Sequence, residues 1–326
     1  MMYKRLAMLT MVMSSVVLWS LSQVFAAEVR MFPPPPPLKS PIEGAIDFHV
    51  HSAPDVFGRS IDDIEVAKAA AREGMRAIVL KNHVTSTADR AAIVTKAVPG
   101  IEVFGGIVLN QAVGGINPGA VEWMYRMSGG RGKVVWMPTF DADHHLKTFK
   151  EPGDGIRAAK DGKLLPETEA VLKVIARENL VLQTGHLSPE EILLVIKGAK
   201  ELGVKNIAIT HAMADVPGMS LEQMKEAAAM GAYMELDFLN ALMGPHAHMG
   251  WMQHWKQISF DDMAKAIQAV GAQHFILATD LGQTGNPIHP DGYKLLVAGL
   301  KKAGVSQEDL NLMMKTNPSK LLGLAP

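Results

Sequence analysis

Residues 44–51 read Gly-Ala-Ile-Asp-Phe-His-Val-His, and this stretch organises the interpretation of the whole chain. It alternates apolar and polar side chains, which is the period-two pattern of a β-strand whose two faces differ. His49 and His51 fall on the same face, where two imidazoles can reach one metal ion. The alternative is a half-exposed strand end, and the later histidines of the chain favour the metal site.

The composition is that of an ordinary globular protein, with 326 residues, 48% of them hydrophobic and 20% charged, and a net charge of −1. This length is sufficient for one large core. A nucleic-acid-binding face requires a basic excess, so we expect no nucleic-acid partner. Cysteine is absent, which excludes disulfides and cysteine-ligated metals. A metal site must use His, Asp, Glu or a modified Lys, a set that suits Zn, with Mn or Fe as alternatives.

The N-terminus has the features of a secretory signal. Lys4 and Arg5 precede an apolar run over residues 6–21, and small residues allow cleavage after Ala26. The alternative is an uncleaved membrane anchor, which the Ser and Gln residues of the run disfavour. We therefore expect a signal peptide at residues 1–26, a proline-rich spacer at 27–43 and one domain at 44–326. The expected location is the periplasm or the extracellular space, with no stable membrane association after cleavage.

From residue 44 onward, short apolar runs alternate with amphipathic segments. Eight strands are expected, at residues 45–50, 76–80, 101–109, 133–137, 180–184, 206–210, 232–237 and 274–279. Eight helices are expected near residues 61–73, 87–97, 117–128, 166–178, 188–202, 220–229, 259–269 and 291–303, several of them with capping residues. Eight strand–helix units in about 275 residues predict an α/β protein with a (β/α)₈ TIM barrel. An open doubly wound sheet is the alternative, but no glycine-rich phosphate fingerprint follows the first strand.

Polar residues recur immediately after these apolar runs. The carboxyl ends of the strands form the active-site face of a (β/α)₈ barrel, so these side chains are expected on one rim. In chain order the set is His49, His51, Lys81, His83, His186, His211 and Asp280. Within this set, the imidazoles of His49, His51, His186 and His211 and the carboxylate of Asp280 predict a metal-dependent active site.

In this arrangement the chain resembles the amidohydrolase superfamily, which comprises metal-dependent hydrolases built on a (β/α)₈ barrel. The resemblance covers residues 44–326 and includes the ending Thr-Asn-Pro-Ser-Lys-Leu-Leu-Gly at 316–323. It implies one or two divalent cations and a catalytic aspartate that takes a proton from water and gives it to the leaving group. The residues that match the ligand pattern of the family are His49, His51, His186, His211 and Asp280.

The chain departs from the family at the bridging lysine. Binuclear members carry a carbamylated lysine at the end of strand four, but residues 134–141 contain no lysine. Lys81 ends the second strand and shares its parity with Ala77 and Val79, so it faces the interior if they do. A desolvated lysine can accept CO₂ or bind an anion. Three roles therefore stay open for Lys81: a metal-bridging carbamate, a catalytic or substrate-binding lysine, and a solvent-reaching rim residue.

The sequence predicts a hydrolase in which a divalent cation activates water for attack on a small amide, lactone or ester. The candidate catalytic residues are Asp280, Lys81 and His211, and the candidate metal ligands are His49, His51, Lys81, His186, His211 and Asp280. A decarboxylase or a phosphoesterase can use the same ligands. A non-catalytic periplasmic protein that binds its ligand through the metal also stays open.

The segment at residues 240–257 is long and rich in Met, Trp and His. Such loops commonly act as lids or binding loops, so a small apolar or aromatic substrate is expected beneath it. Burial of these side chains against the barrel rim, or in a homo-oligomer interface, is the alternative.

Five residues are weaker candidates for substrate contacts. Arg59 can hold a substrate carboxylate or pair with the nearby Asp55. Glu235 can support a ligand histidine or can be an ordinary barrel carboxylate. Asp141, which is not one of the five, can supply a metal ligand after strand four or cap a loop. The candidate substrate contacts are Arg59, His83, Glu235, His248 and Trp251.

Overall fold

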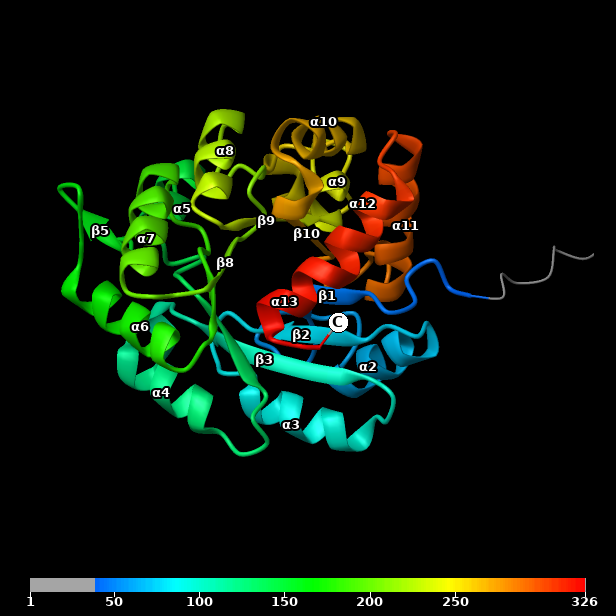
Figure 1. The fold of residues 1–326 in the computed structure, drawn as a ribbon, viewed down its shortest axis with the longest axis horizontal. Coiled ribbons are helices and arrows are strands. Elements are labelled where there is room, and N and C mark those ends of the chain that lie inside the picture. Colours follow the sequence, from blue (N-terminus) through cyan, green and yellow to red (C-terminus); the bar gives the residue numbers. More distant parts are fainter. Residues whose placement is uncertain (1–38, 326) are drawn as a thin grey trace, which may run out of the picture. The chain divides into compact units, whose positions relative to one another are not determined.

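The alternating apolar runs form eight parallel strands, so the predicted (β/α)₈ barrel is confirmed (Figure 1). The computed structural model describes residues 39–325, and the expected signal peptide at 1–26 and most of the spacer lie outside them. The strands follow one another around the barrel as β1 (Ile46–His51), β2 (Ala77–Lys81), β3 (Glu102–Val108), β4 (Gly132–Trp136), β7 (Val181–Gln183), β8 (Asn206–Ile209), β9 (Tyr233–Asp237) and β10 (Phe275–Ala278).

The barrel closes where the first strand meets the last. Val50 forms a parallel bridge with Leu281, just beyond the end of β10. The backbone N–H of His51 donates to the Leu281 carbonyl at 3.0 Å, and the N–H of Asp280 donates to the His49 carbonyl at 2.9 Å. We call this the β1–β10 seam. It holds three of the predicted ligands, His49, His51 and Asp280, on adjacent chain segments.

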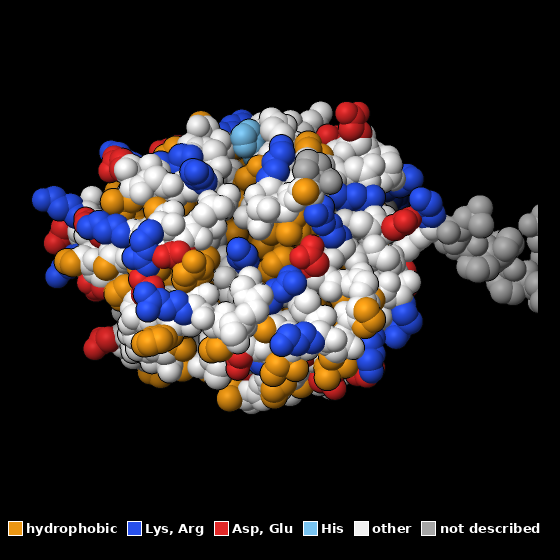
Figure 2. Space-filling view, turned by 60° about the horizontal axis from the view of Figure 1, so that its bottom comes forward, with side chains coloured by type: hydrophobic (Ala, Val, Ile, Leu, Met, Phe, Trp, Pro, Cys, Tyr) orange, Lys and Arg blue, Asp and Glu red, His pale blue; other side chains and the backbone are white. Residues whose placement is uncertain are grey.

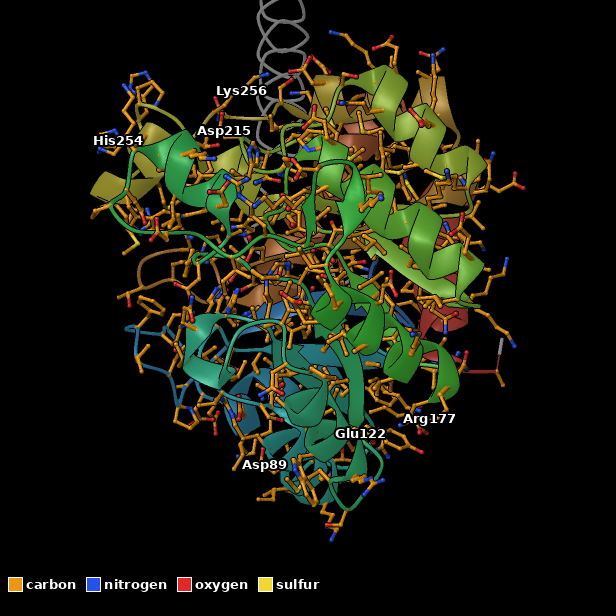
Figure 3. All side chains as sticks on the ribbon, turned by 90° about the vertical axis from the view of Figure 1, so that its left-hand side faces the viewer. Asp89, Glu122, Arg177, Asp215, His254 and Lys256 are labelled. Carbon is orange, nitrogen blue, oxygen red and sulfur yellow. The ribbon has the colours of Figure 1, made fainter. Side chains whose placement is uncertain are left out.

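The eight expected helices cover the outside of the strands (Figure 1). Ser188 and Ser220 begin two of them with capping boxes, in which the serine hydroxyl accepts from the N3 backbone and the N3 side chain accepts from the serine N–H. On the surface, Arg177 pairs with Glu122 across two helices (Figure 3). The helices are α2 (Asp63–Arg72), α3 (Ala88–Ala97), α4 (Pro118–Arg126), α6 (Pro166–Arg177), α7 (Pro189–Glu201), α8 (Leu221–Ala229), α10 (Phe260–Val270) and α11 (His289–Lys302).

Several short elements were not expected from the sequence, because each is too brief to show a clear hydrophobic period. They are α5 (Asp143–Phe149), the hairpin β5 (Ala159–Lys160) and β6 (Lys163–Leu164), α9 (Phe238–Leu242), α12 (Gln307–Asn311), the π-helical η4 (Leu312–Thr316), α13 (Asn317–Leu322), and the 3₁₀ turns η1 (Gln111–Val113), η2 (Gly250–His254) and η3 (Ala272–His274). Two of these, α5 and α9, follow strands at the rim of the site.

The apolar core has two layers. One lies between strands and helices, and the other fills the barrel interior. Leu321 and Leu322 of α13 belong to the interior cluster, together with Ile46 and Ala77 at the starts of their strands. Helix α13 therefore covers the end of the barrel opposite His49, His51 and Asp280. Charged side chains of both signs are interspersed over the face shown in Figure 2. Among the described residues no helix is both long and apolar enough to cross a membrane.

The compact unit begins at Ser40, within the expected spacer. The Ser40 hydroxyl donates to Glu73 at 2.7 Å, and Ile42 is fully buried. These contacts hold the segment that precedes β1 against the barrel.

Asp47 is a buried carboxylate that strengthens the β1–β10 seam. It accepts hydrogen bonds from the hydroxyl of Thr279 at 2.6 Å and from the N–H groups of Thr279 and His49 at 2.9 and 3.2 Å. Burial raises the pKa of Asp47 to about 7, although the hydrogen bonds from Thr279 act in the opposite direction. Burial of a carboxylate disfavours its charged form, and here that cost exceeds the stabilisation by its donors.

Stability should therefore depend on pH through Asp47. Its pKa is about 7 in the folded protein against 3.8 for the unperturbed group, so the stability it contributes below about pH 4 is lost as the pH rises toward 7. The free energy of unfolding of the wild type should fall relative to that of Asp47→Asn by up to about 1.4 kcal/mol per pH unit in this range. Urea unfolding of both proteins from pH 4 to 8 measures the difference. Parallel curves would contradict this assignment.

Candidate metal centre

Three donor atoms converge at the β1–β10 seam. Asp280 Oδ1 lies 3.0 Å from His49 Nε2 and 3.1 Å from His51 Nε2, and the two imidazole nitrogens lie 3.2 Å apart. All three side chains are buried; the two histidines lie on β1, and Asp280 follows β10, far away in the sequence. This triangle of two nitrogens and one carboxylate oxygen is a donor set that suits a divalent metal ion.

A carboxylate orients His49 from behind. His49 Nδ1 donates to Glu235 Oε1 at 2.9 Å, and its Nε2 faces the point where Asp280 Oδ1 and His51 Nε2 converge. Glu235 is fully buried and also accepts from Gln183 Nε2 at 2.7 Å. A carboxylate on the far nitrogen of a ligand histidine fixes the tautomer and the ring orientation. Two roles were expected for Glu235. The structure favours the first, in which Glu235 supports a ligand histidine.

The seam concentrates negative charge around His49. Burial lowers the pKa of His49, but the charges of Asp280 and Glu235 outweigh burial, so this pKa is raised. Burial raises the pKa of Asp280, but the neighbouring His49 and His51 hold it well below its usual range. Positive charge at this point is thus stabilised by the surrounding carboxylates, as a bound cation requires.

Lys81 lies at the same centre. Its Nζ is 3.0 Å from His49 Nε2 and 5.5 Å from the ring centre of Trp136. Its side chain is buried, so the parity argument for an inward lysine is confirmed and the solvent-reaching alternative is wrong. Burial lowers the pKa of Lys81, opposed by Asp280 and Glu235. A lysine in this position is available to act as a nucleophilic amine or as an anion-binding group.

The other two predicted ligands lie on an adjacent wall. His186 follows β7 and His211 follows β8, with their ring centres 4.9 Å apart. The ring centre of His211 is 6.1 Å from that of His49, and His211 Nδ1 has no hydrogen-bond partner within the described chain. Burial lowers the pKa of His211 to about 4, so its imidazole is neutral near pH 7. The six candidate ligands named from the sequence, Lys81 included, therefore lie at one rim, in two neighbouring groups.

A cavity of about 670 Å³ opens over these residues. His51, Lys81 and Asp280 contribute to its wall together with His186 and His211. The remaining lining is largely apolar and aromatic, which suits a small organic ligand. The apolar part includes Phe57, Phe140, Phe149, Met243, Met249 and Trp255.

The segment at 240–257 was expected either to cover a substrate or to be buried against the barrel rim, and parts of it do each. Trp251 lines the cavity and is 42% exposed, whereas Met252 is fully buried against the barrel. The N–H of Lys256 donates to Asp215 in the loop after β8, which ties the segment to the rim (Figure 3). Phe149 of α5 stacks on Trp255 with ring centres 4.7 Å apart. These contacts form an aromatic wall beside the candidate metal ligands.

Two of the weaker candidates for substrate contacts, His83 and Arg59, line the cavity. His83 lines the cavity, where its ring stacks on His51 at 4.8 Å and contacts Phe140 at 4.1 Å. Arg59 also lines the cavity, but its guanidinium pairs with Asp55 at 2.7 Å and lies 3.3 Å from His51 Nδ1.

Two other residues lie apart from the cavity lining. His248 is exposed, and its Nε2 donates to the Thr284 carbonyl at 2.9 Å. Asp141 accepts from the N–H of Gln111 at 2.7 Å and so caps a loop. Neither side chain is part of the cavity wall.

Sequence reasoning missed several residues of the site, above all His145 in α5. Its Nδ1 lies 2.8 Å from His186 Nδ1, and its ring is buried in the cavity wall. Phe140 and Phe149 flank it. The only signal available in the sequence was their position directly after the fourth strand.

Comparisons with known proteins agree with this fold. A family described as being of unknown function, DUF6282, matches residues 44–235. No curated protein matches the sequence. Organophosphorus hydrolase from Deinococcus radiodurans is structurally similar, with a TM-score of 0.57 at 15% identity over 86% of this chain and 92% of that chain. A mutant of a PTE-like lactonase from the same organism has a TM-score of 0.56 at 15% identity, over 87% and 97% of the two chains. At this identity the likeness shows a shared barrel fold.

Proposed function

The chain belongs to the DUF6282 family of unknown function, so its activity must be inferred from its site, and we propose that it is a metal-dependent hydrolase of small lactones or esters. The observation that carries the proposal is the convergence of His49, His51 and Asp280 beside a largely apolar cavity, whose wall includes His51 and Asp280. The similar structures are described as an organophosphorus hydrolase and a lactonase, which favours esters and lactones over amides.

His49, His51 and Asp280 would hold the cation, which we propose is zinc. Two imidazole nitrogens and one carboxylate oxygen are typical of catalytic zinc sites, which keep a position open for water or substrate. The orientation of His49 by Glu235 and the negative charge around it fit such an ion. When bound, a divalent cation lowers the pKa of water and polarises the oxygen of the scissile group.

The residues of the chain would move the proton. Asp280 is held as a carboxylate by His49 and His51, and it lines the cavity, so it can accept a proton from the attacking water. The same carboxyl group can then give that proton to the leaving alkoxide. Lys81 would place an amine beside the reacting oxygen, and His211 a neutral imidazole on the neighbouring wall. These roles account for the three candidate catalytic residues.

The cavity favours an apolar or aromatic substrate. Phe57, Phe140 and Trp255 offer faces against which a ring or an acyl chain can pack, and the Met side chains of the wall can adapt to its shape. A phosphoester remains a second candidate because one similar structure is described as an organophosphorus hydrolase. From the N-terminal sequence we further propose that the protein acts in the periplasm or is secreted.

Removal of metal should abolish hydrolysis. Dialysis of the purified protein against a chelator should lower activity toward an aryl ester or an aromatic lactone to background, and Zn²⁺ or Mn²⁺ should restore it. Metal content by mass spectrometry and rates for a panel of lactones, carboxylic esters, amides and phosphotriesters measure both effects. The member of the panel that turns over identifies the reaction type.

His49→Ala and His274→Ala form the matched pair for this experiment. His274 lies at the opposite end of β10 from Asp280, outside the cavity wall. His49→Ala should lose metal and activity, whereas His274→Ala should retain both. Turnover by the metal-free wild type, or no metal after reconstitution, would overturn the proposal.

A further inference from the structure

Arg59, in the loop between β1 and α2, has a guanidinium that its ion pair occupies only in part. Its Nε and Nη2 both donate to the same oxygen of Asp55, Oδ2, at 2.8 and 2.7 Å. The other oxygen of Asp55, Oδ1, accepts from the backbone N–H groups of Val56 and Phe57. The ion pair therefore holds one edge of the guanidinium in place, and Nη1 donates to no acceptor within the described part of the chain.

Arg90 shows what a fully occupied guanidinium looks like in the same region. Its Nε and Nη2 donate to the two oxygens of Asp63, each at 2.7 Å, and Nη2 also donates to the Ser52 carbonyl at 3.1 Å. Arg90 is not part of the cavity wall, whereas Arg59 lines the cavity and has only 5% of its side chain exposed. A molecule that meets the remaining N–H groups of Arg59 must therefore occupy the cavity.

The second N–H of Arg59 Nη2 faces a residue of the β1–β10 seam. Arg59 Nη2 lies 3.3 Å from His51 Nδ1, and His51 Nε2 lies 3.1 Å from Asp280 Oδ1. A neutral imidazole that gives Nε2 to a cation carries its single proton on Nδ1, so two donors would then face each other. A bound acceptor relieves this conflict, because it can take the N–H of Nη2 together with that of Nη1.

The outer edge of the Arg59 guanidinium, formed by Nη1 and the second N–H of Nη2, is a fork of two donors. A planar fork of this kind matches the two oxygens of a carboxylate. Lys81 adds a second positive charge to the same wall, with its Nζ 3.0 Å from His49 Nε2. This part of the wall is therefore suited to a carboxylate that lies close to the seam.

We propose that Arg59 is a specificity-determining residue and that the substrate is a lactone or ester that carries a carboxylate close to its scissile bond. The carboxylate binds the outer edge of Arg59, and the scissile group lies at the seam, one imidazole ring away. The apolar part of the substrate packs against Phe57 and Phe140 in the same wall. The choice of an ester or lactone rests on the proposed function, whereas the carboxylate subsite depends on the cavity alone.

Two esters that differ only in the charge of one end test the proposal. Monophenyl glutarate has a free carboxylate, and phenyl methyl glutarate has the same group blocked; the release of phenol measures kcat/KM for each. In the wild type the free acid should be preferred by about 10–100-fold, which is the contribution expected of hydrogen bonds to a charged group. In Arg59→Lys the ratio should fall to about 1, because an ammonium that pairs with Asp55 has no second edge to offer.

Arg90→Lys is the matched control, since it also removes a guanidinium that pairs with an aspartate, but outside the cavity wall. It should keep the wild-type ratio. Arg59→Lys retains a positive charge beside the buried Asp55, and Arg59→Gln provides a second variant without that charge. Circular dichroism verifies that each variant is folded.

Binding of glutarate is a second measurement that needs no turnover. Isothermal titration calorimetry should show that the Kd for glutarate rises by about 10–100-fold in Arg59→Lys and Arg59→Gln and is unchanged in Arg90→Lys. An unchanged Kd, or an unchanged ratio between the two esters, in Arg59→Lys would overturn the inference.

The two measurements also separate this inference from the proposed function. A wild type that hydrolyses both esters equally well overturns the inference and leaves the hydrolase proposal intact. A wild type that hydrolyses neither these esters nor any member of the substrate panel overturns the proposed function. The glutarate titration then decides by itself whether Arg59 forms a carboxylate subsite.

Discussion

Asp280→Asn should lower kcat/KM by about 10²–10⁴-fold while the protein keeps its fold, because the amide cannot accept the proton of the attacking water. The substitution preserves the size of the side chain and leaves one oxygen to face His49 and His51. Rates on the substrate found in the panel, together with circular dichroism, measure the effect. The bound metal is counted in the same preparation, so that loss of the ion is distinguished from loss of the proton acceptor.

Asp89→Asn is the matched control for this substitution. Asp89 is exposed on α3, and Figure 3 shows it at the opposite edge of the molecule from His254, a residue of the cavity wall. The kcat/KM of Asp89→Asn should equal that of the wild type. If Asp280→Asn retained activity within tenfold of the wild type, another group would have to transfer the proton.

Trp136→Ala should destabilise the protein by about 3–5 kcal/mol, the largest effect on stability that we expect. Trp136 is fully buried in the barrel interior, in the cluster that contains Phe48 and Phe104. Its removal leaves a cavity among strands that cannot collapse, and it removes the ring beneath the Lys81 ammonium. Urea unfolding at constant pH measures the change in the free energy of unfolding.

Trp123→Ala is the control for the loss of an indole as such. Trp123 is 71% exposed on α4, where Arg126 lies over its ring. Its replacement should cost less than about 1 kcal/mol, since few contacts are lost at the surface. Equal effects of the two substitutions would show that the interior of the barrel adapts far more readily than its packing indicates.

The barrel could be predicted because its signal repeats. Each strand is a short apolar run, each long helix has an apolar stripe, and eight repetitions leave few alternative folds. The site could be predicted to the extent that it lies at strand ends. His49, His51 and Asp280 were placed correctly on one rim, and the parity of Lys81 gave its inward direction.

The remainder of the site lies on loops and short helices, where the spacing of residues in the sequence does not show which way a side chain points. His145 lies in the seven-residue helix α5, and nothing in the sequence distinguishes it from His144, which turns toward Pro217. Phe149 and Trp255 meet through tertiary packing between segments more than a hundred residues apart. The pairing of Arg59 with Asp55 was one of two alternatives that charge alone could not separate.

The β1–β10 seam has a consequence for how the protein matures. The two halves of its donor triangle are encoded more than two hundred residues apart, and neither half offers a complete coordination sphere. A chain still emerging from the ribosome, or truncated before β10, therefore lacks the Asp280 donor of the proposed metal site. Acquisition of the metal would report that the last strand has docked against the first, and a metal-loaded molecule is by that criterion a fully assembled one.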